Sequence, residues 1–152
     1  MPSRRAQITM TEDELEAFLA ERRIMQLATV GPSGRPHVVP IWYVPDGVEL
    51  RGWTYAKSQK ARNLERDPRA TVAIEDGVAY HELRGVMLEC DVHVERDRER
   101  VLDYGLALVE RYLGDSEDAR EQFRGQAEKR VGLRLSPTRI VSWDHRKLKG
   151  EY

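Results

Sequence analysis

Short apolar runs separated by turn residues fill the first half of the chain and predict strands. The runs cover Ile24 to Val30, Pro36 to Val44 and Val48 to Tyr55, and they are separated by Gly31-Pro-Ser-Gly34 and by Pro45-Asp-Gly47. Runs of this length between turn residues are typical of β-strands. We expect the three segments to pair in sequence order as an antiparallel meander.

Two short helices are predicted around these strands. Thr11 and Glu14 form a capping box ahead of an apolar stripe at helical spacing, which indicates a helix over residues 11–22. The polar segment 57–67 lacks β-branched residues and stops before Pro68, so it is expected to form a second helix.

The second half of the chain mixes long strands with helices. A strand is expected over 70–75, and alternation over 80–94 predicts a long half-buried strand. Helical periodicity spans 96–130, and two strand-like segments, 131–135 and 138–143, flank a Ser-Pro pair. The helical stripe expected to face the barrel is Val101, Leu102, Leu106, Val109 and Leu113. This order favours a mainly β fold, an antiparallel barrel with appended helices, over a doubly wound sheet.

The amino-acid composition limits the classes of function that the chain is expected to have. The chain has 152 residues, which fits one domain over 1–152, and its 25 Lys and Arg nearly balance its 26 Asp and Glu. Non-specific nucleic-acid binding is therefore not expected, and attraction for phosphate must come from local clustering. The single cysteine, Cys90, excludes an internal disulfide and is expected to be a buried strand residue. The sequence shows neither a secretory leader nor a membrane-spanning run, so we expect a cytoplasmic protein.

The most informative segment for chemistry lies where the third strand meets the second predicted helix. The strand ends near Thr54, and the helix opening carries Lys57, Ser58, Lys60 and Arg62. A helix start presents unpaired N–H groups and a positive dipole end, so these side chains could form a phosphate site. A solvated basic face is the alternative, and the composition alone leaves both open.

This segment resembles the cofactor-phosphate segment of the pyridoxamine 5'-phosphate oxidase-like split barrels, which bind FMN or coenzyme F420. The matching run extends from Lys57 through Asn63-Leu64 to Asp67-Pro68-Arg69, and the hairpin formed by 27–30 and 35–43 is similar to the family's first hairpin. The resemblance covers about residues 10–95 well. Within the family, the chain is most similar to the F420-dependent reductases.

The resemblance implies ten cofactor-binding residues in two groups. Strand residues would border the ring system, and residues around the helix start would hold the phosphate. The ring-bordering residues are Val39, Pro40, Ile41 and Trp42. The phosphate group has Lys60 and Arg62 as its main cations, Ser58 and Thr54 as hydroxyl donors, and Lys57 and Asn63 as flanking residues.

The implied function is an F420H2-dependent reductase that passes hydride to a small organic acceptor. An FMN-dependent enzyme of the same family and a non-enzymatic flavin- or haem-binding protein are the alternatives. No catalytic side chain is required, because the cofactor carries the hydride chemistry. Tyr43, Tyr55 and His37 stay open as proton donors. A second basic patch for the anionic F420 tail is expected from Arg66, Arg69 and the C-terminal segment 145–149.

The resemblance also implies a homodimer with two equivalent cofactor sites at the subunit interface. Residues 143–147 could then approach the partner's site. The chain departs from the oxidase itself at Val39, where an arginine is expected, and in the ending Ser142–Leu148, so vitamin B6 oxidation is not expected. No metal site is expected either, because the four histidines, His37, His81, His93 and His145, lack ligand spacing.

Overall fold

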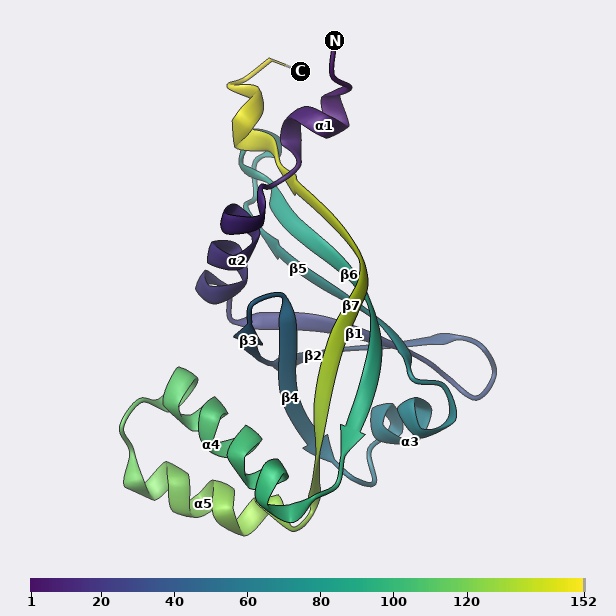
Figure 1. Ribbon diagram of the computed structural model, residues 1–152, viewed down its shortest axis with the longest axis vertical. Helices are drawn as coiled ribbons and strands as arrows, with labels where there is room; N and C mark the ends of the chain where they lie inside the picture. Colours follow the sequence, from purple (N-terminus) through teal and green to yellow (C-terminus); the bar gives the residue numbers. More distant parts are fainter. Residues whose placement is uncertain (152) are drawn as a thin grey trace.

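One seven-stranded antiparallel sheet forms the framework of the molecule (Figure 1), with strand order β2-β1-β5-β6-β7-β4-β3 in a computed structural model that describes residues 1–151. The strands are β1 (Ile24–Val30), β2 (Pro36–Trp42), β3 (Val44–Asp46), β4 (Glu49–Tyr55), β5 (Arg69–Asp76), β6 (Arg84–Glu95) and β7 (Arg130–Asp144). The helices are α1 (Arg4–Ile8), α2 (Glu12–Glu21), α3 (Gln59–Arg66), α4 (Arg98–Leu113) and α5 (Glu117–Ala127), with 3-10 turns at Tyr80–Glu82 and His145–Leu148.

The sheet curls so that its two ends approach each other. A Cβ atom on Gly52 of β4 would lie 3.1 Å from the backbone oxygen of Trp42 of β2, although β2 and β4 are not paired. A larger residue at this position would push the two backbones apart by a few tenths of an ångström, so glycine favours their close approach. The result is the split barrel with appended helices that the sequence predicted, and the mainly β fold class is confirmed.

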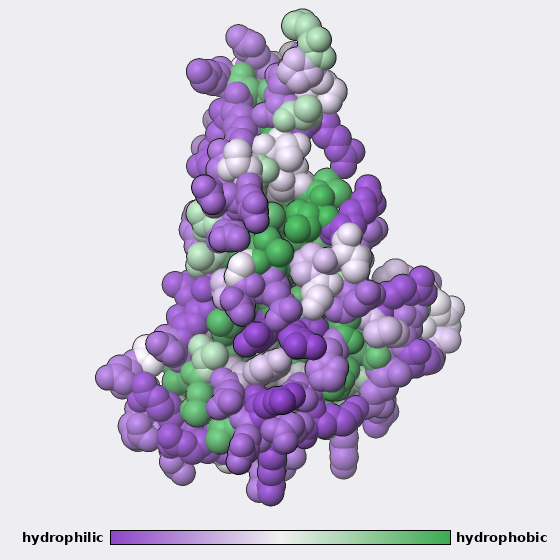
Figure 2. Space-filling model, in the orientation of Figure 1, coloured by the Kyte–Doolittle hydropathy of each residue, from purple (hydrophilic) through white to green (hydrophobic). Residues whose placement is uncertain are grey.

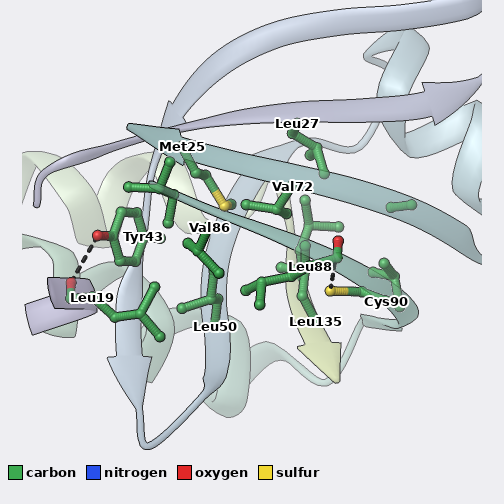
Figure 3. Close-up of a cluster of buried hydrophobic side chains, with 14 of the residues drawn as sticks. Leu19, Met25, Leu27, Tyr43, Leu50, Val72, Val86, Leu88, Cys90 and Leu135 are labelled. Carbon is green, nitrogen blue, oxygen red and sulfur yellow. Dashed lines mark hydrogen bonds between the residues drawn. The ribbon is translucent and has the colours of Figure 1, made fainter. Parts of the chain in front are cut away.

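The interior of the barrel is filled by alternate residues of every long strand. Leu27, Val72, Leu88 and Leu135 are fully buried, and Figure 3 shows them meeting side chains from β4 and α2. Each such side chain contributes roughly 1.5–3 kcal/mol by leaving water. A second, smaller cluster lies outside the barrel, where Trp53 packs beneath α4 and α5.

The predicted meander is confirmed in part. β1 pairs with β2, and β3 pairs with β4 across the predicted Pro45-Asp-Gly47 turn. The expected single strand over 36–44 divides into β2 and the start of β3, however, and β3 and β4 form the opposite edge of the sheet, where β4 pairs with β7 and not with β2. Local turn chemistry predicts hairpins well, whereas the partner of β4 lies about 80 residues further along the chain. Pairing at that separation has no signal in the local pattern.

Several boundaries also differ from the prediction. The two segments at 131–135 and 138–143 form one continuous strand, because a register shift against β6 absorbs the Ser-Pro pair that was expected to break it. Residues 80–82 form a 3-10 turn ahead of β6. In α4 the buried residues include Gly105 and Leu108, whereas Leu113 of the predicted stripe is 42% exposed. Within residues 1–151 no helix is long and apolar enough to span a membrane.

Candidate functional site

The hydroxyl residues of the predicted phosphate segment meet where β4 ends and α3 begins. Thr54 is buried, and its Oγ1 lies 3.2 Å from Oγ of Ser58. Ser58 is the N-cap of α3 and accepts a hydrogen bond from the Ala61 N–H at 3.2 Å. The connecting loop is fixed to the residue that precedes β7, because the Ala56 N–H donates to the backbone oxygen of Lys129 at 2.9 Å. We call residues 54–62 the β4–α3 junction.

The cations of the junction flank α3 from different sides. Lys60 and Arg62 are two residues apart, which separates them by about 200° around the helix axis. Lys60 is half-buried and lies toward β7, whereas Lys57 and Arg62 are exposed. Within residues 1–151, none of the three side chains forms an ion pair with a carboxylate.

A residue that the sequence did not suggest, Arg130, completes this group of cations. The register pairs it with Tyr55 across β4 and β7, and its guanidinium carbon lies 3.6 Å from the centre of the Tyr55 ring. One terminal nitrogen donates to Oε1 of Gln126 at 2.9 Å, while its buried Nε has no hydrogen-bond partner. Only the β4–β7 pairing brings Arg130 here, so the local sequence carries no signal for it.

The pKa values of Lys60 and Arg130 reflect burial that no neighbouring carboxylate offsets. Burial is the larger cause that lowers the pKa of Lys60, and the nearby positive charge of Arg130 lowers it further. Burial likewise lowers the pKa of Arg130. Two partly buried like charges that lack a carboxylate between them are unfavourable unless an anion binds.

Asn63 lies on the other side of α3 and is held by protein partners. Its amide nitrogen donates to Oγ1 of Thr29 at 3.0 Å, and its amide oxygen accepts from Gln59 at 2.8 Å and from Arg66 at 3.3 Å. It is fully buried. In this arrangement Asn63 fixes α3 against β1, and the structure does not bring its amide together with the cations of the junction.

The predicted ring-bordering residues lie on β2, at one edge of the sheet. Val39 and Ile41 alternate with the exposed Pro40 and Trp42. The ring of Trp42 stacks on Tyr112 of α4, with centroids 4.4 Å apart and planes 5° from parallel, yet the side chain stays 37% exposed. Helix α4 therefore fixes one face of Trp42 and leaves the side chain partly open.

Among the three residues left open as proton donors, the environments differ sharply. Tyr43 is fully buried, its hydroxyl donates to the Leu19 carbonyl at 2.7 Å, and burial raises its pKa to about 12. Tyr55 is 51% exposed beside the junction. His37 lies on β2, and its buried Nδ1 has no hydrogen-bond partner. Tyr43 is enclosed, so its hydroxyl has no path to a bound ligand. Tyr55 and His37 are not enclosed in this way.

The expected second basic patch is already engaged within the chain. Arg69 makes two hydrogen bonds to Asp67, Arg146 makes two to Asp144, and Lys147 contacts Glu14 and the Thr9 carbonyl. The segment 145–149 also lies at the end of the molecule opposite α3 (Figure 1). Within one chain these residues do not extend the junction.

The junction as a whole is suited to an anion. It offers hydroxyl groups, a helix start, and lysine and arginine side chains, and residues 54–62 contain no carboxylate. The orphaned Nε of Arg130 and Nδ1 of His37 add polar atoms that the protein itself leaves unpaired. The hydroxyl groups, the helix start and the cations of the junction fit a phosphate group.

Comparison with known proteins gives a consistent picture. The sequence profile of pyridoxamine 5'-phosphate oxidase matches residues 11–144. An F420H(2)-dependent biliverdin reductase of Mycobacterium tuberculosis is 33% identical over 94 residues, which span 60% of this chain and 69% of the relative.

Two solved structures share the fold over most of their length. The conserved hypothetical protein Rv2991 from Mycobacterium tuberculosis superimposes with a TM-score of 0.90 at 41% identity, covering 99% of this chain and 95% of that chain. A structure described as an F420 reductase superimposes with a TM-score of 0.68 at 27% identity, covering 82% of this chain and 94% of that chain.

Proposed function

The chain belongs to the pyridoxamine 5'-phosphate oxidase family, and we propose that it is an oxidoreductase that uses coenzyme F420, bound by its phosphate at the β4–α3 junction. Its reaction is the transfer of hydride from the reduced coenzyme to a small organic acceptor. The observation that carries this proposal is a carboxylate-free group of cations around the start of α3, in which Lys60 and Arg130 are partly buried without an anion to balance them.

The residues divide into a phosphate group and a ring group. Ser58 and Thr54 supply hydroxyl hydrogen bonds to the phosphate, and Lys60 and Arg62 approach it from the two sides of α3. Lys57 lies at the edge of this position, where it adds positive charge. When bound, the coenzyme supplies the hydride, and the protein contributes position and exclusion of water.

The ring system is proposed to lie along β2, against Val39, Pro40, Ile41 and Trp42. The stacking of Trp42 on Tyr112 supports this placement, because a ring that is already fixed on one face offers a rigid surface to a planar ligand. His37 lies on the same strand, and its buried Nδ1 has no hydrogen-bond partner within the chain.

F420 is preferred over FMN because of the relatives. The biliverdin reductase and the F420 reductase are both named for F420, and their identities to this chain are 33% and 27%. The F420 tail also carries carboxylates after its phosphate, which suits a site with more cations than one phosphate requires. An FMN-dependent reaction on the same barrel is the alternative.

We further propose that two copies assemble through the outer face of the sheet. One cross-strand row on this face runs through Pro40, Gln26, Ala73, Met87 and Val141. These residues are small or apolar apart from Gln26, and Figure 2 shows hydrophobic residues at mid-height over β5, β6 and β7. An apolar sheet face without a covering helix is suited to a second copy.

The test of the reaction is anaerobic oxidation of reduced F420 in the presence of acceptors of different classes, namely enones, quinones and tetrapyrroles. The proposal predicts that at least one class reoxidises the coenzyme only when the protein is present, and that Ser58→Ala slows this reaction. If FMN replaces F420 with equal or higher rate, the chain uses the alternative cofactor. Binding of the coenzyme without turnover of any acceptor would favour a non-enzymatic carrier.

A further inference from the structure

We propose that the cofactor site holds a second anion position, between Lys60 and Arg130, which takes a carboxylate of the cofactor tail beyond the phosphate. This inference rests on the proposed function and identifies the part of the site that binds the tail of the cofactor. It assigns to Arg130 a role that is separate from phosphate binding.

The two anion positions lie on opposite faces of the same strand pair. Thr54 faces the barrel interior, where it is paired with the buried Val131. Tyr55 and Arg130 are the next residues along β4 and β7, so their side chains point to the outer face. A group held by the Thr54 and Ser58 hydroxyls is therefore separated from Arg130 by the strand ends.

Arg130 is held in place by contacts that are independent of any ligand. Its guanidinium lies over the rings of Tyr55, at 3.6 Å, and Trp53, at 5.0 Å, and it donates to Gln126. These contacts fix the side chain and leave Nε–H without a partner in a buried position. A fixed arginine that retains an unused donor is preorganised for an acceptor from outside the chain.

The chemistry of that acceptor follows from the neighbouring charge. The positive charge of Arg130 contributes to the lowered pKa of Lys60, after burial, and no carboxylate within residues 1–151 forms an ion pair with either side chain. An anion between them relieves the repulsion and satisfies the free N–H. A carboxylate fits because its two oxygens can accept from a guanidinium N–H and from an ammonium at the same time.

This arrangement makes tail recognition separable from phosphate recognition. FMN carries a phosphate but no carboxylate, so it occupies the phosphate position of the junction and leaves the position beside Arg130 empty. F420 carries both groups and occupies both sides. Arg130→Gln is therefore expected to weaken F420 binding by about tenfold or more, the usual loss for one charge-assisted hydrogen bond, and to change FMN binding by less than about threefold.

A matched control is available on the same end of the molecule. Arg98 of α4 is an exposed arginine that pairs with Glu128, so it already has its anion. Arg98→Gln removes the same charge as Arg130→Gln and is expected to leave the affinity for both ligands unchanged. Loss of F420 affinity in both variants would mean that long-range charge, and not a specific position, is responsible.

NMR of the wild-type protein gives a direct readout that does not require the variant to fold. The buried Arg130 Nε–H should give its own resonance, and the backbone amides of the β4–α3 junction report the phosphate. The inference predicts that F420 shifts both the junction amides and the Nε–H, whereas FMN shifts the junction amides alone.

The remaining outcomes overturn the inference in distinguishable ways. If F420 shifts the junction amides and leaves the Arg130 Nε–H unchanged, the second position is wrong and the proposed function stands. If FMN and F420 shift the Nε–H equally, Arg130 binds the phosphate itself and the second position is again wrong. If F420 shifts neither set, the proposed function fails, and this inference fails with it.

Discussion

Tyr55 and Arg130 face each other across β4 and β7, with the guanidinium carbon 3.6 Å from the ring centre. A cation–π contact of this kind contributes about 0.5–2 kcal/mol, depending on its exposure. We therefore expect a double-mutant cycle of Tyr55→Leu and Arg130→Gln, measured by urea unfolding, to give a coupling free energy in that range. A coupling indistinguishable from zero would mean that the contact does not fix Arg130.

The lowered pKa of Lys60 predicts how binding depends on pH. In the folded, ligand-free protein, burial and Arg130 disfavour the ammonium form, so its pKa lies below the ordinary 10.5. A bound anion favours the ammonium form. Affinity for F420 is therefore full below the lowered pKa and falls as the pH rises through it. Titrations at successive pH values from neutral toward 10.5 should show this fall in the wild type and in Lys57→Met, whereas Lys60→Met should bind weakly at every pH.

The same pKa shift has a consequence for stability. Because the pKa of Lys60 is lower in the folded state than in the unfolded state, the ligand-free protein gains stability as the pH rises from the lowered pKa toward 10.5. This gain should be smaller in Lys60→Met than in the wild type when unfolding is measured by urea at successive pH values. An equal gain in both proteins would show that other groups dominate in this range.

Two glycines in the helices above Trp53 give a matched test of packing. A Cβ on Gly105 would lie 2.4 Å from the Trp53 ring, which is itself held between Arg130 and Phe123, whereas nothing lies within 4 Å of a Cβ on Gly125. Alanine improves helix propensity by about 1 kcal/mol at either position. We expect Gly125→Ala to raise the free energy of unfolding by up to about 1 kcal/mol, and Gly105→Ala to lower it by roughly 1–2 kcal/mol, because overpacking outweighs propensity. Thermal unfolding of the two variants decides this.

Cys90 is predicted to be chemically inert in the folded protein. It is buried in β6, and burial raises the pKa of its thiol to about 12. Since the thiolate is the reactive form, a thiol reagent at neutral pH should label it only after denaturant is added. Rapid labelling of the native protein would place Cys90 in an accessible environment, contrary to the structure.

The sequence predicts the local elements of this fold well and its long-range pairing poorly. The capping box at Thr11 and Glu14 forms as expected, and Ser58 caps α3. These features depend on residues a few positions apart. The pairing of β4 with β7 depends on contacts across the whole chain, and no local pattern encodes it.

The candidate site shows the same division. Thr54, Ser58 and Lys60 are close in sequence and lie together in the structure, so their grouping could be read from the chain. Arg130 joins them only through the β4–β7 register. The Trp42 stack on Tyr112 forms only because the C-terminal end of α4 reaches the end of β2. Asn63 differs from these residues: it belongs to the local motif, but the motif does not reveal that its amide donates a hydrogen bond to Thr29.

The central claim is that the β4–α3 junction binds the phosphate of F420, and a fluorescence titration of F420 tests it most directly. The titration compares the wild type with Lys60→Ala, Arg62→Ala and the control Arg96→Ala, whose arginine pairs with Glu65 on the exposed side of α3. We predict tight binding by the wild type and the control, and affinities lower by about tenfold or more in the two junction variants. Wild-type affinity in both junction variants, or no binding of F420 by the wild type, would contradict the account.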